Sequence, residues 1–302
     1  MKKAHTLILG SGYETIPMRN LMVQRWRFSF LNRKMAVCIA SALLSLVFST
    51  VSFSQKILDI KADQLQVDPL GRLILLDKDQ GNIWCYSNEL DLIAYNQINV
   101  WGNTLQLDLN DPMKPIVFFP DVNRIRFFDE QLSASTALDL DYFQLFNIQA
   151  AGIASLGGFW LFSRDLNKII RIDQSGRNLF ESSDLNFVFG GYPVVEQIKE
   201  VDDYLVLIAE SGLFYVFDFF GNYQFKIQLE PKGLYHLSED RFFFLEPSGK
   251  LSIVNLAEAG TLYPIKDIEE SFYSFSVFGA DFYGLNATGV YKLSLLKQES
   301  ED

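Results

Sequence analysis

A pattern of about 40 residues recurs six times along the chain and constrains its fold more than any other feature. In each copy, a run of large apolar residues is followed by a short polar turn and a second strand-like segment. The first copy reads Leu73-Ile74-Leu75-Leu76, then Gly81, then Ile83-Trp84-Cys85-Tyr86. These residue types favour β-strands, so the pattern predicts a series of similar hairpins.

A Gly or Asn occupies the turn of every copy, and both residue types tolerate the positive φ of tight hairpin turns. The first strand of each hairpin is continuously apolar, which suits a strand covered on both faces. The second strand alternates with polar residues and suits a position nearer the solvent. These two kinds of strand are expected inside a β-propeller blade. The six turn residues are Gly81, Asn123, Asn167, Gly212, Gly249 and Gly289.

The two ends of the repeated region indicate how the ring closes. In copies one to five, the second strand is followed by enough residues for an outermost fourth strand, but the last copy runs into a polar tail, 299–302. A spare segment, 56–60, precedes the first copy. We therefore predict an all-β, six-bladed β-propeller over residues 55–298, with four-stranded antiparallel blades and a ring closed by the N-terminal strand.

Residues 1–54 have the pattern of a signal peptide. A basic stretch ends at Lys34, residues 35–53 carry no charge, and small residues at 52 and 54 predict cleavage before Gln55. The basic lead is long, so we expect an over-extended start and initiation at Met22 or Met35. The mature chain is then exported and is periplasmic, outer-membrane associated or secreted. The alternative is an uncleaved membrane anchor, because 19 apolar residues just span a bilayer.

Charge and cysteine content restrict the partners and the covalent chemistry. Removing residues 1–54 leaves 19 basic against 36 acidic residues. This surface repels phosphate backbones, so nucleic acid is not expected as a partner. Cys85 is the only cysteine left, which excludes an internal disulfide and predicts a buried, inert thiol. We expect a monomer.

The segment Asp68-Pro69-Leu70-Gly71-Arg72-Leu73 resembles the entry motif of a blade in the NHL-like and TolB-like propeller superfamily. Residues 111–119 and 127–132 are also similar to a group of exported bacterial propellers with no assigned activity. The resemblance implies the six-bladed fold and transfers no site residues. WD40 repeats, quinone-dependent dehydrogenases and amidating lyases are set aside, because their recurrent Trp-Asp, Trp or histidine motifs do not occur here.

The scarcity of histidine limits the chemistry of the central channel. His236 is the only histidine after residue 54, so zinc and copper sites built from His and Cys ligands cannot be assembled. A Ser–His–Asp triad would have to use this residue. His236 is expected on the innermost strand of blade five, as a channel-lining or hydrogen-bonded histidine.

The innermost strands are predicted to line the channel with polar side chains, several of them glutamines. A ring of neutral amides indicates a water-filled, hydrogen-bonding channel, and no metal site or cofactor is predicted. Calcium is the alternative, because it needs only oxygen ligands and propeller lactonases hold it in their channel. The channel-lining candidates are Gln66, Asp68, Gln106, Asp108, Gln149, Glu196, Gln197, His236 and Ser274.

Three functions remain open from the sequence. The favoured one is a non-catalytic propeller of the bacterial cell envelope that binds or scaffolds a protein or peptide. The alternatives are a calcium-dependent hydrolase or lactonase with its site in the channel, and a sensor that binds a glycan or small ligand. Most aromatic clusters are assigned to packing between blades, but Phe219 and Phe220 precede a turn glycine and are candidates for surface contact.

Overall fold

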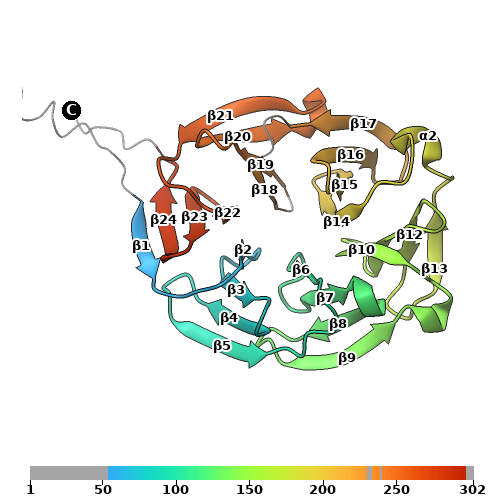
Figure 1. Cartoon of the computed structure of the whole chain (residues 1–302), viewed down its shortest axis with the longest axis horizontal. Helices are drawn as coiled ribbons and strands as arrows, with labels where there is room; N and C mark the ends of the chain where they lie inside the picture. The colour runs from blue at the N-terminus through green and yellow to red at the C-terminus, as the bar shows by residue number, and fades with distance from the viewer. Residues whose placement is uncertain (1–53, 230–232, 239, 297–302) are drawn as a thin grey trace, which may run out of the picture. The chain divides into compact units, whose positions relative to one another are not determined.

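The computed structural model describes residues 54–229, 233–238 and 240–296, which form six four-stranded antiparallel sheets around a central axis (Figure 1). We name the strands of each blade A to D from the centre outwards. The face that carries the A–B and C–D turns is the A–B face, and the opposite face, with the B–C turns and the connections between blades, is the B–C face. The predicted fold is confirmed.

The strands follow the repeat in chain order. They are β2 (Gln64–Val67), β3 (Leu73–Asp77), β4 (Asn82–Tyr86) and β5 (Leu92–Gln97) in blade 1; β6 (Gln106–Asp108), β7 (Ile116–Phe119), β8 (Arg124–Phe128) and β9 (Ala134–Asp139) in blade 2; β10 (Ile148–Ile153), β11 (Phe159–Ser163), β12 (Lys168–Ile172) and β13 (Asn178–Glu181) in blade 3; β14 (Val195–Val201), β15 (Tyr204–Ala209), β16 (Leu213–Asp218) and β17 (Tyr223–Gln228) in blade 4; β18 (Leu234–Leu237), β19 (Phe242–Leu245), β20 (Lys250–Asn255) and β21 (Thr261–Asp267) in blade 5; and β22 (Ser274–Phe278), β23 (Asp281–Asn286), β24 (Gly289–Ser294) and β1 (Gln55–Leu58) in blade 6.

Short helices occupy some connections between these strands. The α-helical turn α2 (Asn186–Phe189) precedes blade 4, and the 3-10 turns are η1 (Pro120–Val122), η2 (Asp141–Phe143) and η3 (Leu256–Glu258). Within the residues described, no helix is long and apolar enough to cross a membrane. Residues 1–53 of the predicted signal peptide and the predicted polar tail lie outside the described residues.

Strand β1 closes the ring as the sequence predicts. It pairs antiparallel with β24, with Gln55 opposite Lys292 and Lys56 opposite Tyr291. Blade 6 is therefore built from both ends of the described chain. The closure gives the outer edge of β24 a hydrogen-bonded partner and buries the sixth blade against the first.

The six turn residues predicted from the repeat all adopt positive φ, from 50° at Asn167 to 138° at Gly289. Five of them lie in a B–C turn, between the apolar strand and the alternating strand of their blade, and Gly289 is the first residue of β24, directly after such a turn. Gly and Asn suit these positions because Gly has no Cβ to clash at positive φ, and Asn tolerates the left-handed region better than most residues. The repeat therefore records the geometry of the B–C turn.

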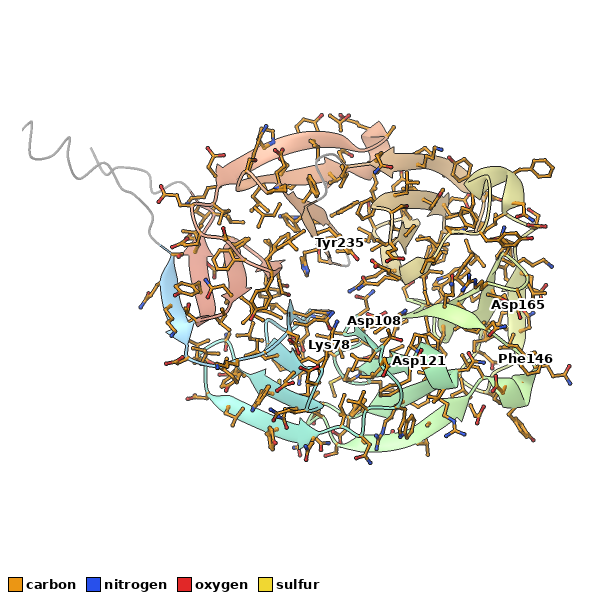
Figure 2. The ribbon with its side chains drawn as sticks, viewed as in Figure 1. Lys78, Asp108, Asp121, Phe146, Asp165 and Tyr235 are labelled. Carbon is orange, nitrogen blue, oxygen red and sulfur yellow. The ribbon has the colours of Figure 1, made fainter. Side chains whose placement is uncertain are left out.

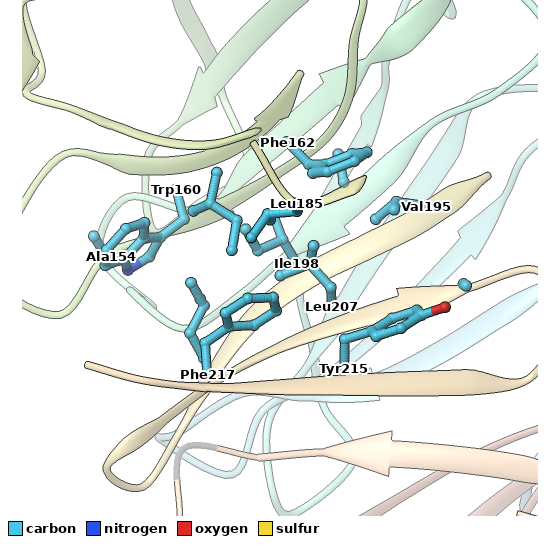
Figure 3. Packing of buried hydrophobic residues seen from close by; sticks show 13 residues of the cluster. Ala154, Trp160, Phe162, Leu185, Val195, Ile198, Leu207, Tyr215 and Phe217 are labelled. Carbon is cyan, nitrogen blue, oxygen red and sulfur yellow. The ribbon is translucent and has the colours of Figure 1, made fainter. Parts of the chain in front are cut away.

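The B strands are continuously apolar because their alternate side chains contact different neighbouring blades. On β3, Leu73 and Leu75 pack against blade 6, while Ile74 and Leu76 pack against blade 2. The same division recurs around the ring, so each of the six hydrophobic clusters lies between two adjacent blades. Figure 3 shows the cluster between blades 3 and 4, where Trp160 and Phe162 face Leu207 and Phe217.

Cys85 belongs to the cluster between blades 1 and 2 and is buried, as predicted. Burial raises the pKa of its thiol to about 11. The thiolate that reacts with oxidants and metals is therefore scarce at neutral pH.

The Asp-x-x-Gly motif that resembles an NHL entry is a hydrogen-bonded turn. In blade 1, Asp68 Oδ1 accepts hydrogen bonds from the backbone N–H groups of Leu70 (3.0 Å) and Arg72 (2.8 Å). Asp218 makes the same pair of bonds, to Phe220 and Asn222, in the C–D turn of blade 4. The motif thus marks a local turn geometry that recurs at two kinds of position in the blades.

The glycine of a C–D turn also allows close packing between blades. Gly221 has φ of +77°, and a Cβ built there would lie 2.7 Å from the ring of Phe180 on the outer strand of blade 3. A Cβ at Gly176 would meet Phe143 at 2.6 Å. At these positions glycine is required by both the backbone conformation and the neighbouring ring.

Replacing Gly221 with alanine should therefore destabilise the propeller more than the backbone conformation alone accounts for. Gly190 is the matched control, because its φ is +70° but a Cβ placed on it would have no atom within 4 Å. We expect Gly190→Ala to cost about 1–2 kcal/mol for the left-handed backbone. Gly221→Ala should cost roughly 1–3 kcal/mol more, because Phe180 must move. Urea unfolding of the two variants measures the difference, and equal losses would contradict the packing argument.

Candidate functional site

The innermost strands β2, β6, β10, β14, β18 and β22 surround the central channel (Figure 2), where Tyr235 and Asp108 border the opening. Eight of the nine predicted channel residues lie on these strands, and Asp68 directly follows β2. Two cavities in the channel are lined by described residues. One, of about 370 Å³, opens toward the A–B face, and the other, of about 340 Å³, opens toward the B–C face. Gln66, Lys199, His236 and Leu237 line both.

The glutamines of the channel connect neighbouring blades. Gln106 Nε2 donates to the backbone oxygen of Gln149 (2.7 Å), and Gln106 Oε1 accepts from the N–H of Ala151 (3.2 Å). Gln149 Oε1 in turn accepts from the N–H of Val195 in blade 4 (3.2 Å). Adjacent innermost strands share no sheet ladder, so these amides satisfy backbone groups that would otherwise face the channel.

Carboxylate and hydroxyl groups make the same kind of bridge. Asp108 Oδ2 accepts from the N–H of Ile153 in blade 3 (2.7 Å), while its Oδ1 accepts from the N–H of Asn110 (3.0 Å). Ser274 Oγ accepts from the N–H of Leu65 across the closure between blades 6 and 1 (3.0 Å). The predicted polar ring therefore has a structural role at these positions, which leaves fewer of its groups to face a ligand.

Asp68 is buried and forms an ion pair with Arg72, at 2.6 Å between Oδ2 and Nε. The same guanidinium donates to the backbone oxygens of Pro112 (2.7 Å) and Glu130 (3.0 Å) in blade 2. This contact ties two A–B face loops of blade 2 to blade 1. Asp68 thus holds the Arg72 guanidinium in the position from which it binds the loops of blade 2.

His236 is buried, with 8% of its surface exposed, and its Nε2 lies 3.2 Å from Ser276 Oγ in blade 6. Burial lowers its pKa to about 3, and the nearby Lys199 ammonium adds to the shift, so the imidazole is neutral at pH 7. Ser276 is fully buried, and its Oγ accepts from the N–H of Val67 (3.0 Å). This Ser–His contact joins blades 5, 6 and 1 and presents no accessible nucleophile.

The neutral state of His236 predicts a specific loss of stability in weak acid. The unfolded chain takes up a proton on this residue below pH 6.5, whereas the folded protein does so only near pH 3. The unfolded state then binds more protons, so stability falls as the pH falls below 6.5, by about 2–3 kcal/mol at roughly pH 4.5. The carboxyls with lowered pKa values, such as Asp139 and Asp218, contribute only nearer their usual range of about 4.

Chemical denaturation of wild-type protein and His236→Gln at several pH values between about 4.5 and 7.5 tests this assignment. The wild type should lose stability progressively over this range, and the variant should show a nearly flat profile. A variant with the wild-type slope would show that another group is responsible.

Lys199 is a channel residue that was not predicted from the sequence. It lies on β14 two positions after Gln197, so the two side chains share one face of the strand, while Glu196 is exposed. Its Nζ lies 3.8 Å from Asp108 Oδ1. The alternation of Gln197 and Lys199 along a predicted innermost strand was the available signal. Among the described residues, no group of three or more His, Cys, Asp or Glu side chains is placed to hold a metal ion.

A cavity larger than the two channel cavities lies on the A–B face, between blades 2 and 3, and we call it the blade 2–3 cleft. It has a volume of about 780 Å³. Its walls come from three A–B connections and two C–D turns. The A–B connections are the long loop 109–115 of blade 2, the loop 154–158 of blade 3 and the tight turn of blade 4, and the C–D turns belong to blades 2 and 3. The length of loop 109–115, the longest of the six A–B connections, was the only sequence signal for this site.

The floor of the cleft is apolar and well packed. Phe127 and Phe159 approach with ring centroids 5.6 Å apart, and Phe128 lies buried beside them. Met113 stands at the rim with 53% of its surface exposed. The flexible thioether of Met113 gives the rim an adaptable apolar contact surface.

The rim of the cleft carries mainly acidic groups. Asp111, Asp129 and Asp202 lie at its edge with Lys114 as the one basic residue of the lining, and the buried Glu200 lies among the walls. Glu200 Oε2 accepts from the N–H of Ser155 (2.7 Å), and its Oε1 accepts from Trp160 Nε1. The cleft therefore presents a negative rim above an apolar floor.

Hydrogen bonds fix the loops that shape the cleft. Asp111 Oδ1 accepts from the N–H groups of Met113 (3.0 Å) and Lys114 (3.2 Å), and Arg72 holds the oxygen of Pro112. Asp129 Oδ1 accepts from Gln131 and Ser133 at 2.9 and 2.8 Å. A site built from such turns is largely formed before a ligand arrives.

The two aromatic residues predicted to make surface contacts lie in the turn between β16 and β17. Phe220 is 76% exposed, and Phe219 is half-buried. Neither lines the cleft or the channel cavities. Their role in contact stays a prediction.

Comparison with known proteins supports the fold. The chain is similar to a streptogramin B lyase structure (11% identity, TM-score 0.50) and to virginiamycin B lyase from Staphylococcus aureus (12% identity, TM-score 0.50), each match covering 82% of this chain and 89% of the other. It is also similar to BamB from Moraxella catarrhalis (14% identity, TM-score 0.44), over 76% of this chain and 70% of that one. No family model and no curated protein sequence matches the chain. At these identities the likeness shows the propeller fold alone.

Proposed function

We propose that this protein is a non-catalytic binding propeller of the bacterial cell envelope that holds a protein or peptide segment in the blade 2–3 cleft. The cleft itself carries the proposal. It is larger than either channel cavity, it combines an apolar floor with polar groups at the rim, and its loops are fixed by hydrogen bonds.

The electrostatics of the cleft specify the kind of segment. Three carboxylates, those of the half-buried Asp111 and of the exposed Asp129 and Asp202, lie at the rim with one lysine, so a segment with Lys or Arg side chains is attracted there. The aromatic floor and Met113 accept an apolar side chain from the same segment. The bound segment therefore carries basic residues next to a large apolar residue.

The wider context of this proposal rests on sequence. The Asp-x-x-Gly turn at residues 68–71 favours membership of the NHL-like and TolB-like propellers. The predicted signal peptide favours export, to the periplasm, the outer membrane or the medium. A rigid ring with one large cleft would serve there as a platform for a protein partner.

Two features of the channel favour binding over hydrolysis. Lys199 places a positive charge next to both channel cavities, which repels a calcium ion. Asp108, the carboxylate nearest to it, already accepts two backbone hydrogen bonds. The calcium-dependent hydrolase is therefore the less favoured function.

Selection of phage-displayed random peptides against the purified propeller tests the proposal. Enriched peptides should combine Lys or Arg with a large apolar residue. The double variant Asp111→Asn/Asp202→Asn should bind them about 3- to 10-fold more weakly, because each surface charge pair contributes about 0.3–1 kcal/mol. Asparagine keeps the turn acceptor at position 111 and tolerates the φ of +53° at position 202.

The control is the double variant Asp267→Asn/Glu269→Gln, which removes two exposed carboxylates near the end of blade 5. It changes the net charge equally but leaves the cleft intact. Affinity measured by isothermal titration at two salt concentrations should fall for the cleft variant and stay near wild type for the control. Equal losses in both variants, or no enriched peptide, would refute peptide binding in the cleft.

A further inference from the structure

The channel cavity on the B–C face, which we call the upper cavity, has a different character from the cleft. Its volume is about 340 Å³, within the range of small-molecule sites. Among the described residues, its charged lining residues are Asp63, Lys78 and Lys199, so two cations face one carboxylate in a chain whose formal net charge is −11. Figure 2 shows Lys78 beside the central opening.

Lys199 is an incompletely paired cation. Only 15% of its side chain is exposed, and its one ion pair within the described residues is the 3.8 Å contact with Asp108. That distance exceeds a hydrogen bond, and both oxygens of Asp108 are already engaged by backbone N–H groups. A buried ammonium group with such weak compensation is costly unless another anion reaches it.

Besides the Asp108 carboxylate, two neutral side chains of the cavity lining lie near Lys199. Gln197 shares its face of β14 and makes no side-chain hydrogen bond to any other described residue, so both amide N–H bonds are available. His236 is an uncharged imidazole in the same lining. Asp63 Oδ2 accepts the backbone N–H of Lys78 at 2.7 Å, which places that carboxylate at the turn.

From this arrangement we propose that the upper cavity is a binding site for a small organic monocarboxylate, whose carboxylate group pairs with Lys199 and accepts hydrogen bonds from Gln197. The charged lining residues that the structure describes sum to one positive unit, which a single carboxylate neutralises. The site is separate from the blade 2–3 cleft. Its occupant is a diffusible small molecule, in contrast to the peptide segment proposed there.

Thermal-shift and isothermal titration measurements on the propeller test this site with acetate, glycolate, lactate and gluconate at constant ionic strength. The neutral compounds lactamide and glycerol are matched controls, and inorganic phosphate tests a different oxyanion. At least one monocarboxylate should bind saturably and raise Tm, while the neutral compounds should not.

Lys199→Met should weaken that binding roughly 10- to 100-fold, as expected for loss of a charged hydrogen-bond donor. Lys250→Met, which changes an exposed lysine at the start of β20, should bind like wild type. Gln197→Leu should cause a smaller loss. Because Asp108 keeps its two backbone partners, Lys199→Met should still fold, and circular dichroism checks this.

If Lys199→Met does not fold, the test compares monocarboxylate binding by Gln197→Leu and wild type, and binding of the neutral compounds by wild type. The proposal is overturned if no monocarboxylate binds, if phosphate alone binds, or if Lys199→Met and Lys250→Met lose affinity equally. Binding that depends on Lys199 and on the ligand carboxylate supports it.

Discussion

Each blade of this propeller has two apolar faces, and it can bury both only by having a neighbour on each side. The B strands express this constraint directly, since alternate residues of β3 enter the clusters shared with blades 6 and 2. The hydrophobic core is therefore a ring of six interfaces. An open arc would leave two blades with an exposed apolar face, and the pairing of β1 with β24 removes that cost for the whole ring.

The polar residues of the innermost strands complement this apolar ring. Strands of neighbouring blades diverge from the axis and share no ladder, so the N–H and C=O groups nearest the channel need other partners. Gln106, Gln149, Asp108 and Ser274 supply them across the blade boundaries. Hydrophobic contacts hold the blades together at mid-radius, and side chain–backbone hydrogen bonds do so near the axis.

The fold could be predicted from the sequence because the repeat reflects the local conformation and burial of each turn and strand. Each blade has a glycine or asparagine at positive φ and a strand buried on both faces, and both features recur at regular intervals in the sequence. The number of blades, the B–C turns and the closing strand could therefore be predicted. The sites were harder, since they depend on relations between blades. The blade 2–3 cleft exists because loops of three blades meet, and Lys199 faces the channel because of its position along β14.

The role of the channel glutamines illustrates the same limit. Their position could be predicted, but their partners are backbone groups of the next blade, which no local pattern reveals. Gln197 was grouped with them, yet it points to the upper cavity without such a partner, next to a lysine. Residues of one type on equivalent strands thus divide into those that join blades and those that remain available to a ligand.

The pairing of β1 with β24 also determines how the ring responds to tension. Gln55 at the start of β1 lies opposite Lys292 near the end of β24, so the chain enters and leaves the ring side by side at the outer edge of blade 6. A pulling force applied through the two ends would load the bonds of this pair one after another, as in unzipping, and would not shear them all together. We therefore expect the β1–β24 pairing, which closes the ring, to be the first part of the propeller to separate under such a force.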